Sequence, residues 1–161
     1  MKNLDFLNKL KAEGKLEIVE LSEHISNSYL IKSNKCTIAA KAVFDVGVYE
    51  NAVSEAYYSM YNTVMALFFK CGIKCENHSA AAIIIRNFFK LEKLHQTFSK
   101  IKQERIDNQY YLIPENTEPL SKEQCREMLD TAQKFNAELL YFLKKIKLEE
   151  INRIRKELEK I

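Results

Sequence analysis

Apolar side chains recur at steps of three and four residues through the stretch of chain from Tyr49 to Ile73. This spacing places them on the faces of an α-helix of roughly six turns. One face carries small residues, which let a neighbouring helix approach closely, and an adjoining face carries large ones. A helix that is apolar over so much of its girth belongs in the middle of a bundle. The small residues are Ala52, Ala56, Ser59 and Thr63, and the large ones are Val53, Tyr57, Met60, Val64, Leu67 and Phe68.

Helical patterns also precede this central stretch. A short amphipathic helix is predicted over residues 3–11, and Gly14 ends it. A long helix is predicted from about Leu16 to Val46, with a break near Ser26 to Ser28 as an alternative. Gly47 suits a left-handed helix end. Because this turn is very short, we expect the long helix to pack antiparallel to the central one.

Three more helical segments follow the central one. Gly72 closes the central helix, and the side chain of Asn77 is suited to cap the next helix, over residues 78–90. That segment is apolar nearly all round, which predicts burial. Another helix is expected from about Leu91 to Tyr111.

The last helix begins at a capping box formed by Ser121 and Gln124. A continuous helix from Lys122 to Lys160 would be roughly 58 Å long, which exceeds a bundle of this size. We therefore expect its end to project or to find a partner. Its tail carries an apolar stripe in a highly charged background, made of Leu148, Ile151, Leu158 and Ile161.

Composition supports a single all-α domain over residues 1–161, with a bundle core at 15–147 and a charged helical extension at 148–161. The chain is 47% hydrophobic and contains only 3 Gly and 2 Pro, which leaves room for few turns. A net charge of +3 is too weak to imply nucleic acid by itself. Four irregularly spaced cysteines and a polar beginning, Met1 to Leu10, predict reduced thiols in a cytoplasmic protein. The apolar runs are too short to predict a membrane span.

Four motifs follow one another between about Ser28 and Phe142: A-A-K-x-x-x-x-x-G-x-Y-E-x-A, A-Y-Y-S-M-Y, an Asn-His pair after a Gly-containing turn, and R-x-x-x-x-Y. Their order and spacing resemble the HEPN domain family, in its small stand-alone prokaryotic branch. The resemblance implies an antiparallel bundle of four to five long helices, usually a homodimer. We expect the dimer interface to draw on the central helix and on the C-terminal extension, whose apolar faces offer contacts to another chain.

The resemblance also suggests functions. Many HEPN domains are metal-independent ribonucleases, and several are toxins encoded beside a minimal nucleotidyltransferase (MNT) antitoxin. The ribonuclease branch carries an Arg followed, after four to six residues, by a His. This chain lacks that motif, since no His follows Arg105 and His95 lies too far beyond Arg86. Asn108 and Gln109 also depart from the usual Ala-Asp, which removes a carboxylate.

Two hypotheses follow. The first is the toxin of a HEPN/MNT-type toxin–antitoxin system that cleaves or binds RNA or a nucleotide. The alternative is a non-catalytic interaction or nucleotide-binding module without ribonuclease activity. The family context favours the first hypothesis, and the missing Arg…His motif favours the second.

Arg105 and His78 are the candidate catalytic residues. A guanidinium can hold a phosphate in bidentate fashion, and an imidazole can transfer protons near neutral pH. The ordinary alternatives are an ion pair for Arg105 and a backbone contact at a helix start for His78. Candidate substrate-binding residues are Tyr58, Asn62 and Tyr110, for which packing or exposure is the alternative.

A metal site is not predicted. Cys71, Cys75 and His78 form a spacing that supplies only three ligands, whereas structural zinc takes four. Gly-rich phosphate loops, G-x-S-x-G and H-E-x-x-H are all missing from the sequence. We therefore expect no cofactor.

Overall fold

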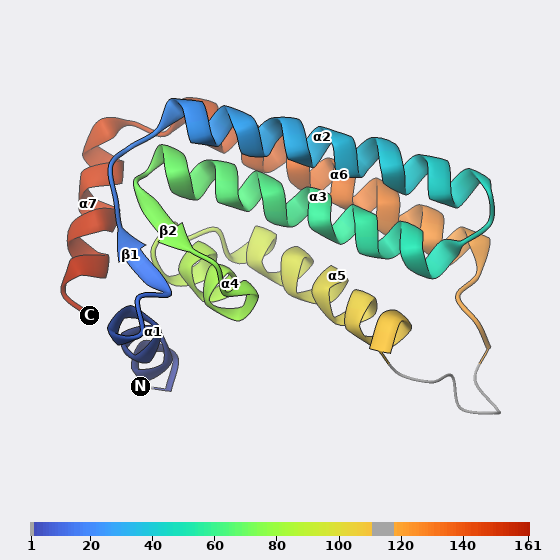
Figure 1. The fold of residues 1–161 in the computed structure, drawn as a ribbon, viewed down its shortest axis with the longest axis horizontal. Coiled ribbons are helices and arrows are strands. Elements are labelled where there is room, and N and C mark those ends of the chain that lie inside the picture. The colour runs from blue at the N-terminus through green and yellow to red at the C-terminus, as the bar shows by residue number, and fades with distance from the viewer. Residues whose placement is uncertain (1, 111–117) are drawn as a thin grey trace.

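Helix α3 (Tyr49–Lys70) runs through the middle of a helical bundle (Figure 1). The computed structural model describes residues 2–110 and 118–161. Within them, α3 contacts three other long helices, which are α2 (Glu23–Asp45), α5 (Glu92–Tyr110) and α6 (Lys122–Lys145). The predicted all-α bundle and the central place of α3 are thus confirmed.

The small face of α3 packs against α2 and α6, and polar side chains join the three helices there. The hydroxyl of Ser33 on α2 donates to the backbone carbonyl of Ser59, with an oxygen–oxygen distance of 2.8 Å. The side chain of Asn136 on α6 accepts from the Thr63 hydroxyl and donates to the Ser59 hydroxyl, at 3.0 and 2.9 Å. Contacts this short between helices require small side chains, as the sequence predicted.

The large face of α3 is covered within the chain itself. Val53, Val64, Leu67 and Phe68 are all fully buried. The expectation that α3 exposes spare apolar surface to a second chain is therefore wrong. The reason is that α5, with α4 (His78–Asn87) packed beside it, covers the side of α3 that α2 and α6 leave open (Figure 1).

The turn between α2 and α3 has the form that the sequence predicted. Gly47 adopts φ = +82°, a left-handed backbone conformation that residues other than glycine rarely adopt. Its backbone N–H donates to the carbonyl of Phe44, which closes the end of α2. The two helices consequently run antiparallel, side by side (Figure 1).

Two short strands were not predicted. Strand β1 (Leu16–Ile18) pairs antiparallel with β2 (Ile73–Cys75), with Glu17 opposite Lys74. The Lys74 ammonium and the Glu17 carboxylate are 2.8 Å apart across the pair. The predicted helix Leu16–Val46 is therefore too long at its start. Its first residues are held extended by strand pairing, and α2 begins at Glu23 after the cap Ser22.

The last predicted helix is also interrupted. Helix α6 ends at Lys145, the backbone becomes extended at Ile146 and Lys147, and α7 (Leu148–Glu159) then turns across the end of the bundle. Its residues Ile151 and Leu158 are buried, so the prediction of a projecting tail is wrong. The amphipathic stripe finds its partner inside the same chain, except at Leu148, which stays exposed.

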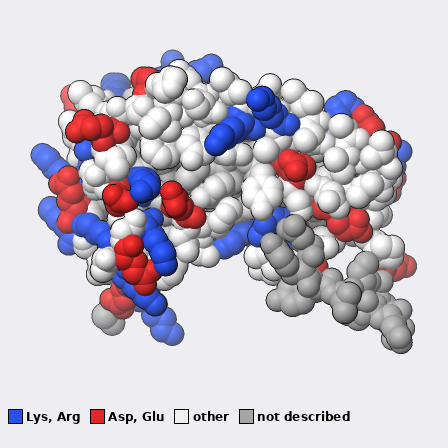
Figure 2. Space-filling model, in the orientation of Figure 1, with Lys and Arg blue, Asp and Glu red and all other residues white. Residues whose placement is uncertain are grey.

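Helix α7 is held in place by hydrogen bonds to backbone carbonyls. The Arg155 guanidinium donates to the carbonyls of Val19 and Gly72 at 2.8 and 2.9 Å. Lys11, at the end of α1 (Lys2–Ala12), donates to the carbonyl of Leu158 at 3.0 Å. Both termini therefore lie at this end of the molecule, where basic and acidic side chains gather densely (Figures 1 and 2).

Candidate functional site

His78 is the first residue of helix α4 (His78–Asn87), directly after the turn that follows β2. The side-chain oxygen of Asn77 accepts from the backbone N–H groups of Ser79 and Ala80 at 3.0 and 2.9 Å. This confirms the predicted cap. The cap and the strand before it fix the backbone at His78, which orients the imidazole towards α3.

The imidazole of His78 lies against two tyrosines of α3. The Tyr57 hydroxyl is 2.6 Å from Nδ1 of His78. The ring of Tyr61 stacks on the imidazole, with centroids 3.9 Å apart and planes 18° apart. Tyr57 is fully buried, and burial raises the pKa of its hydroxyl far above the ordinary value. The hydroxyl therefore keeps its proton at neutral pH and shares a hydrogen bond with Nδ1.

Arg105, on α5, contacts Tyr57 and its neighbour Tyr58. Its Nη1 donates to the Tyr58 hydroxyl at 3.0 Å. Its guanidinium carbon lies 5.0 Å from the ring centre of Tyr57 and 5.5 Å from that of Tyr58, within the range of cation–π attraction. Arg105 and His78 thus meet across one tyrosine, Tyr57, although they are on different helices.

Lys102 joins this group and was not predicted from the sequence. Its ammonium donates to the hydroxyl of Ser79 at 2.7 Å. The signal that would have found it is its position three residues before Arg105, which places both cations on one face of α5. We refer to His78, Lys102 and Arg105 as the cationic cluster.

The members of the cationic cluster lower one another's pKa values. Burial, Arg105 and Lys102 together lower the pKa of His78. Burial and Arg105 likewise lower the pKa of Lys102. Groups whose positive forms are disfavoured in this way are stabilised by an anion, so the electrostatics of the cluster suit a phosphate.

Of the other predicted site residues, the described part of the chain places Tyr58 at this cluster and Asn62 away from it. Tyr58 contacts Arg105 directly, as described above. Asn62 lies on the side of α3 that faces α2, where its amide donates to the carbonyl of Tyr58 at 2.8 Å and to the Cys36 sulfur at 3.6 Å. The side chain of Tyr110 lies outside the described residues.

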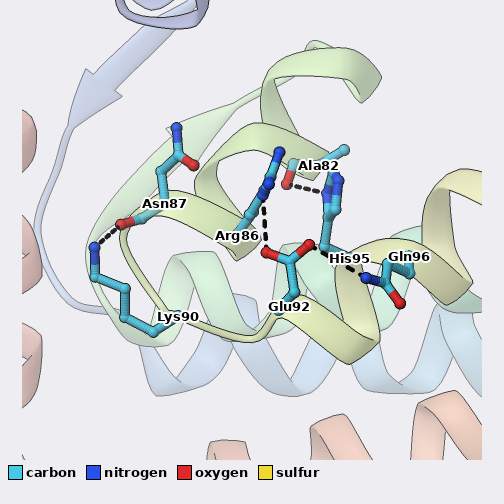
Figure 3. A network of polar contacts seen from close by, with 7 residues as sticks. All are labelled: Ala82, Arg86, Asn87, Lys90, Glu92, His95 and Gln96. Atoms are coloured by element: carbon cyan, nitrogen blue, oxygen red, sulfur yellow. Dashed lines mark hydrogen bonds and ion pairs between the residues drawn. The ribbon is translucent and has the colours of Figure 1, made fainter.

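A second Arg and His pair, Arg86 and His95, has structural partners at the corner between α4 and α5 (Figure 3). Nε of Arg86 donates to the Glu92 carboxylate at 2.8 Å. Nδ1 of His95 donates to the carbonyl of Ala82 at 2.9 Å. A carboxylate therefore neutralises this arginine, and a backbone carbonyl binds this imidazole.

The described part of the chain groups no three His, Cys, Asp or Glu side chains in a manner suited to a metal ion. Cys75 donates to the carbonyl of Asn77, and Cys71 is buried. Burial raises the pKa of the Cys71 thiol to about 12 and that of Cys75 to about 11. Both thiols therefore remain protonated at neutral pH.

The sequence profile of the HEPN domain matches residues 26–140, which is more than half of the chain. The chain belongs to the HEPN domain family. The matched region of this HEPN protein extends from α2 into α6 and therefore includes the whole cationic cluster, while α1, β1 and α7 lie outside it. No curated protein matches the chain significantly.

None of the helices in the described ranges of this HEPN protein is long and apolar enough to cross a membrane.

Proposed function

We propose that this HEPN domain binds RNA or a nucleotide at the cationic cluster and acts as the toxin of a HEPN/MNT-type toxin–antitoxin system. One observation carries the proposal: Lys102, Arg105 and His78 converge from two helices next to the tyrosines of α3. Cations supply the attraction to phosphate, and the partly exposed rings of Tyr58 and Tyr61 supply a surface on which a base can stack.

The same arrangement supports a chemical role for two of these residues. Arg105 would hold the phosphate and stabilise charge that develops on it. His78 would transfer a proton through Nε2, because Nδ1 is occupied by the Tyr57 hydroxyl. Cleavage of this kind needs the 2′-hydroxyl of RNA and no metal ion. The Arg and His of the ribonuclease branch come from one motif, whereas here α5 and α4 each supply one.

The binding proposal is tested with the double variant Arg105→Ala, His78→Ala and a fluorescent single-stranded RNA. We expect its affinity to fall about tenfold or more, because charge-assisted hydrogen bonds to phosphate are lost. The matched control is Arg86→Ala, His24→Gln, which removes the same residue types from outside the site. Equal losses in both variants would contradict the proposal.

Any cleavage of RNA should be independent of metal and should depend on Arg105 or His78. The measurement follows labelled RNA with the wild-type chain in EDTA and with the double variant. Loss of cleavage in EDTA would refute metal independence. A double variant that cleaves at the wild-type rate would remove both residues from the chemistry.

The toxin role is tested by growth. Expression of the chain alone should arrest growth, and co-expression of an adjacent MNT reading frame should relieve the arrest. An adjacent frame that encodes no nucleotidyltransferase would count against the MNT partner.

The second candidate function is a non-catalytic nucleotide-binding or interaction module. The absent Arg…His motif favours it, since His78 and Arg105 do not share one helix. RNA that binds but is never cut, together with normal growth on expression, would establish this alternative.

A further inference from the structure

Aromatic side chains follow one face of α3 away from the cationic cluster. Tyr58, Tyr61 and Phe69 lie within about 80° of one another around the helix, and each of them is partly exposed. Tyr58 is the member that contacts the cluster, through Arg105. Phe69 follows Tyr58 by eleven residues, which corresponds to roughly 16 Å along the helix axis. The rings therefore form a row that begins at the cationic cluster and runs to the end of α3.

A tyrosine of α2 extends this row at its far end. The ring of Tyr29 stacks on Phe69, with centroids 5.4 Å apart and planes 11° apart, and it is also partly exposed. Burial is the largest cause of the raised pKa of Tyr61, and Cys75 and Tyr29 add to it, so Tyr29 lies near Tyr61 as well. We refer to Tyr29 and Phe69 as the second platform.

The charges beside the row are mixed. The ammonium of Lys32 on α2 lies 4.9 Å from the ring centre of Tyr29, whereas the carboxylate of Glu76 lies near Tyr61 and raises its pKa further. Figure 2 shows this face of the molecule, where uncharged side chains cover the middle of α3 and basic groups lie on either side of it, over α2 and near α5. Stacking on the rings, more than net charge, must therefore supply the attraction for a ligand along this row.

Separated aromatic rings of this kind suit the bases of a single strand. A base of any identity has a flat face that stacks on an aromatic side chain, and in a single strand this face is available. The row spans roughly 16 Å, so a strand with bases about 3.4 Å apart needs about five nucleotides to cover it. A mononucleotide at the cationic cluster cannot reach the second platform.

We propose that Tyr29 and Phe69 form a second base-stacking platform, so that the site takes a single-stranded RNA of several nucleotides in preference to a mononucleotide. This inference rests on the proposed function, since it extends the site for RNA or a nucleotide along α3. The strand runs from the cationic cluster to the second platform, where Lys32 contacts a phosphate beside the stacked base.

The test compares UMP with an eight-nucleotide oligouridylate by isothermal titration calorimetry at one fixed salt concentration. The wild-type chain should bind the octamer about tenfold or more tightly than UMP. The double variant Tyr29→Leu, Phe69→Leu keeps apolar volume and removes both rings of the second platform. It should lower the ratio of octamer affinity to UMP affinity about tenfold, because the stacked bases at the far end of the strand lose their partners.

The chain offers a matched control at the other end of the same two helices. The rings of Phe44 and Tyr49 also pair between α2 and α3, with centroids 5.6 Å apart, and the guanidinium of Arg126 lies over Phe44. The double variant Phe44→Leu, Tyr49→Leu therefore removes two rings with similar surroundings from outside the row. It should keep the wild-type ratio of affinities.

Lys32→Glu provides a test that leaves the packing of the rings intact, because Lys32 is exposed. The new carboxylate opposes a phosphate at the second platform, so the ratio of affinities should fall about fivefold or more. A wild-type ratio in both Lys32→Glu and the Tyr29→Leu, Phe69→Leu variant would overturn the second platform.

The outcomes also separate this inference from the proposed function. Equal affinities of the wild-type chain for UMP and the octamer would overturn the second platform and leave nucleotide binding at the cationic cluster intact. A ratio that falls in the Tyr29→Leu, Phe69→Leu variant, with octamer affinity unchanged in Arg105→Ala, His78→Ala, would support the second platform and contradict the proposed cluster. Absence of binding for both probes would overturn both.

Discussion

At the scale of single residues, His78 is the group whose surroundings oppose its own charge. Burial is the largest cause of its lowered pKa, and the cations Arg105 and Lys102 add to it. Protonation of His78 in the folded chain therefore lowers the unfolding free energy, unless an anion is bound beside it.

This predicts how the unfolding free energy responds to pH. The unfolded chain takes up a proton at His78 near the ordinary value of 6.5, whereas the folded chain takes it up only at lower pH. As the pH falls through this range, the unfolded state binds the proton first and stability is lost. Urea denaturation between about pH 8 and about pH 5 should show a steeper loss for wild type than for His78→Gln. Parallel curves for the two proteins would refute this coupling.

At the scale of elements, helix α7 determines how the bundle ends. Its apolar face, which includes the fully buried Ile154, packs into the same core as α3 and α4. Arg155 of α7 donates to the carbonyl of Val19, just after β1, and to that of Gly72, just after α3. Lys11 of α1 donates to the carbonyl of Leu158 in α7. The helix is therefore an integral part of the folded core and not an appendage.

Substitution within α7 should accordingly destabilise the whole domain. We expect Ile154→Ala to lower the unfolding free energy by about 2–5 kcal/mol, since it removes buried methylene groups and leaves a cavity. The matched control Leu148→Ala removes an apolar side chain from the same helix at a position that is 62% exposed. Its effect should stay within about 0.5 kcal/mol. Urea denaturation that gives equal values for the two variants would show that α7 does not share the cooperative core.

At the scale of the whole molecule, α2 carries exposed apolar side chains that a second chain can cover. Ile31 and Ile38 are 59% and 62% exposed and stand two turns apart on one face of that helix. Neither α3 nor the tail offers a comparable face, because both are covered within the chain. We therefore propose α2 as the interface of the homodimer that HEPN membership suggests.

Sedimentation equilibrium at tens of micromolar should find a dimer of the full chain. The double variant Ile31→Glu, Ile38→Glu should be monomeric, because the dimer would bury unpaired charges. Leu148→Glu, which introduces one such negative charge at a similarly exposed position, should remain dimeric. A monomeric wild type would refute the homodimer, and a dimeric double variant would remove α2 from its interface.

The sequence by itself determined the features that depend on neighbouring residues. Helical periodicity identified the central helix, and capping chemistry located helix starts at Asn77 and Ser121. Gly47 marked a helix end for the same reason, since a positive φ is a local property of the backbone. The motif order also led to the HEPN family, and it pointed to Arg105 and His78 as residues of interest.

Only the tertiary structure decided what those elements meet. Strands β1 and β2 are three residues each, too short to show a pattern, and they form because packing brings distant segments together. The break between α6 and α7 contains neither Gly nor Pro, so an apolar stripe there is compatible with a straight helix or a folded one. Burial of Ile154 and the hydrogen bonds of Arg155 favour the folded form.

The candidate site shows the same division. Sequence spacing within one helix cannot reveal that His78 and Arg105 share Tyr57, because the crossing of α3, α4 and α5 places them together. Nor can it reveal that a buried tyrosine hydroxyl forms a hydrogen bond with a histidine on another helix. The sequence specifies which side chains are present, but packing determines which of them lie close together, how deeply they are buried and how their pKa values shift.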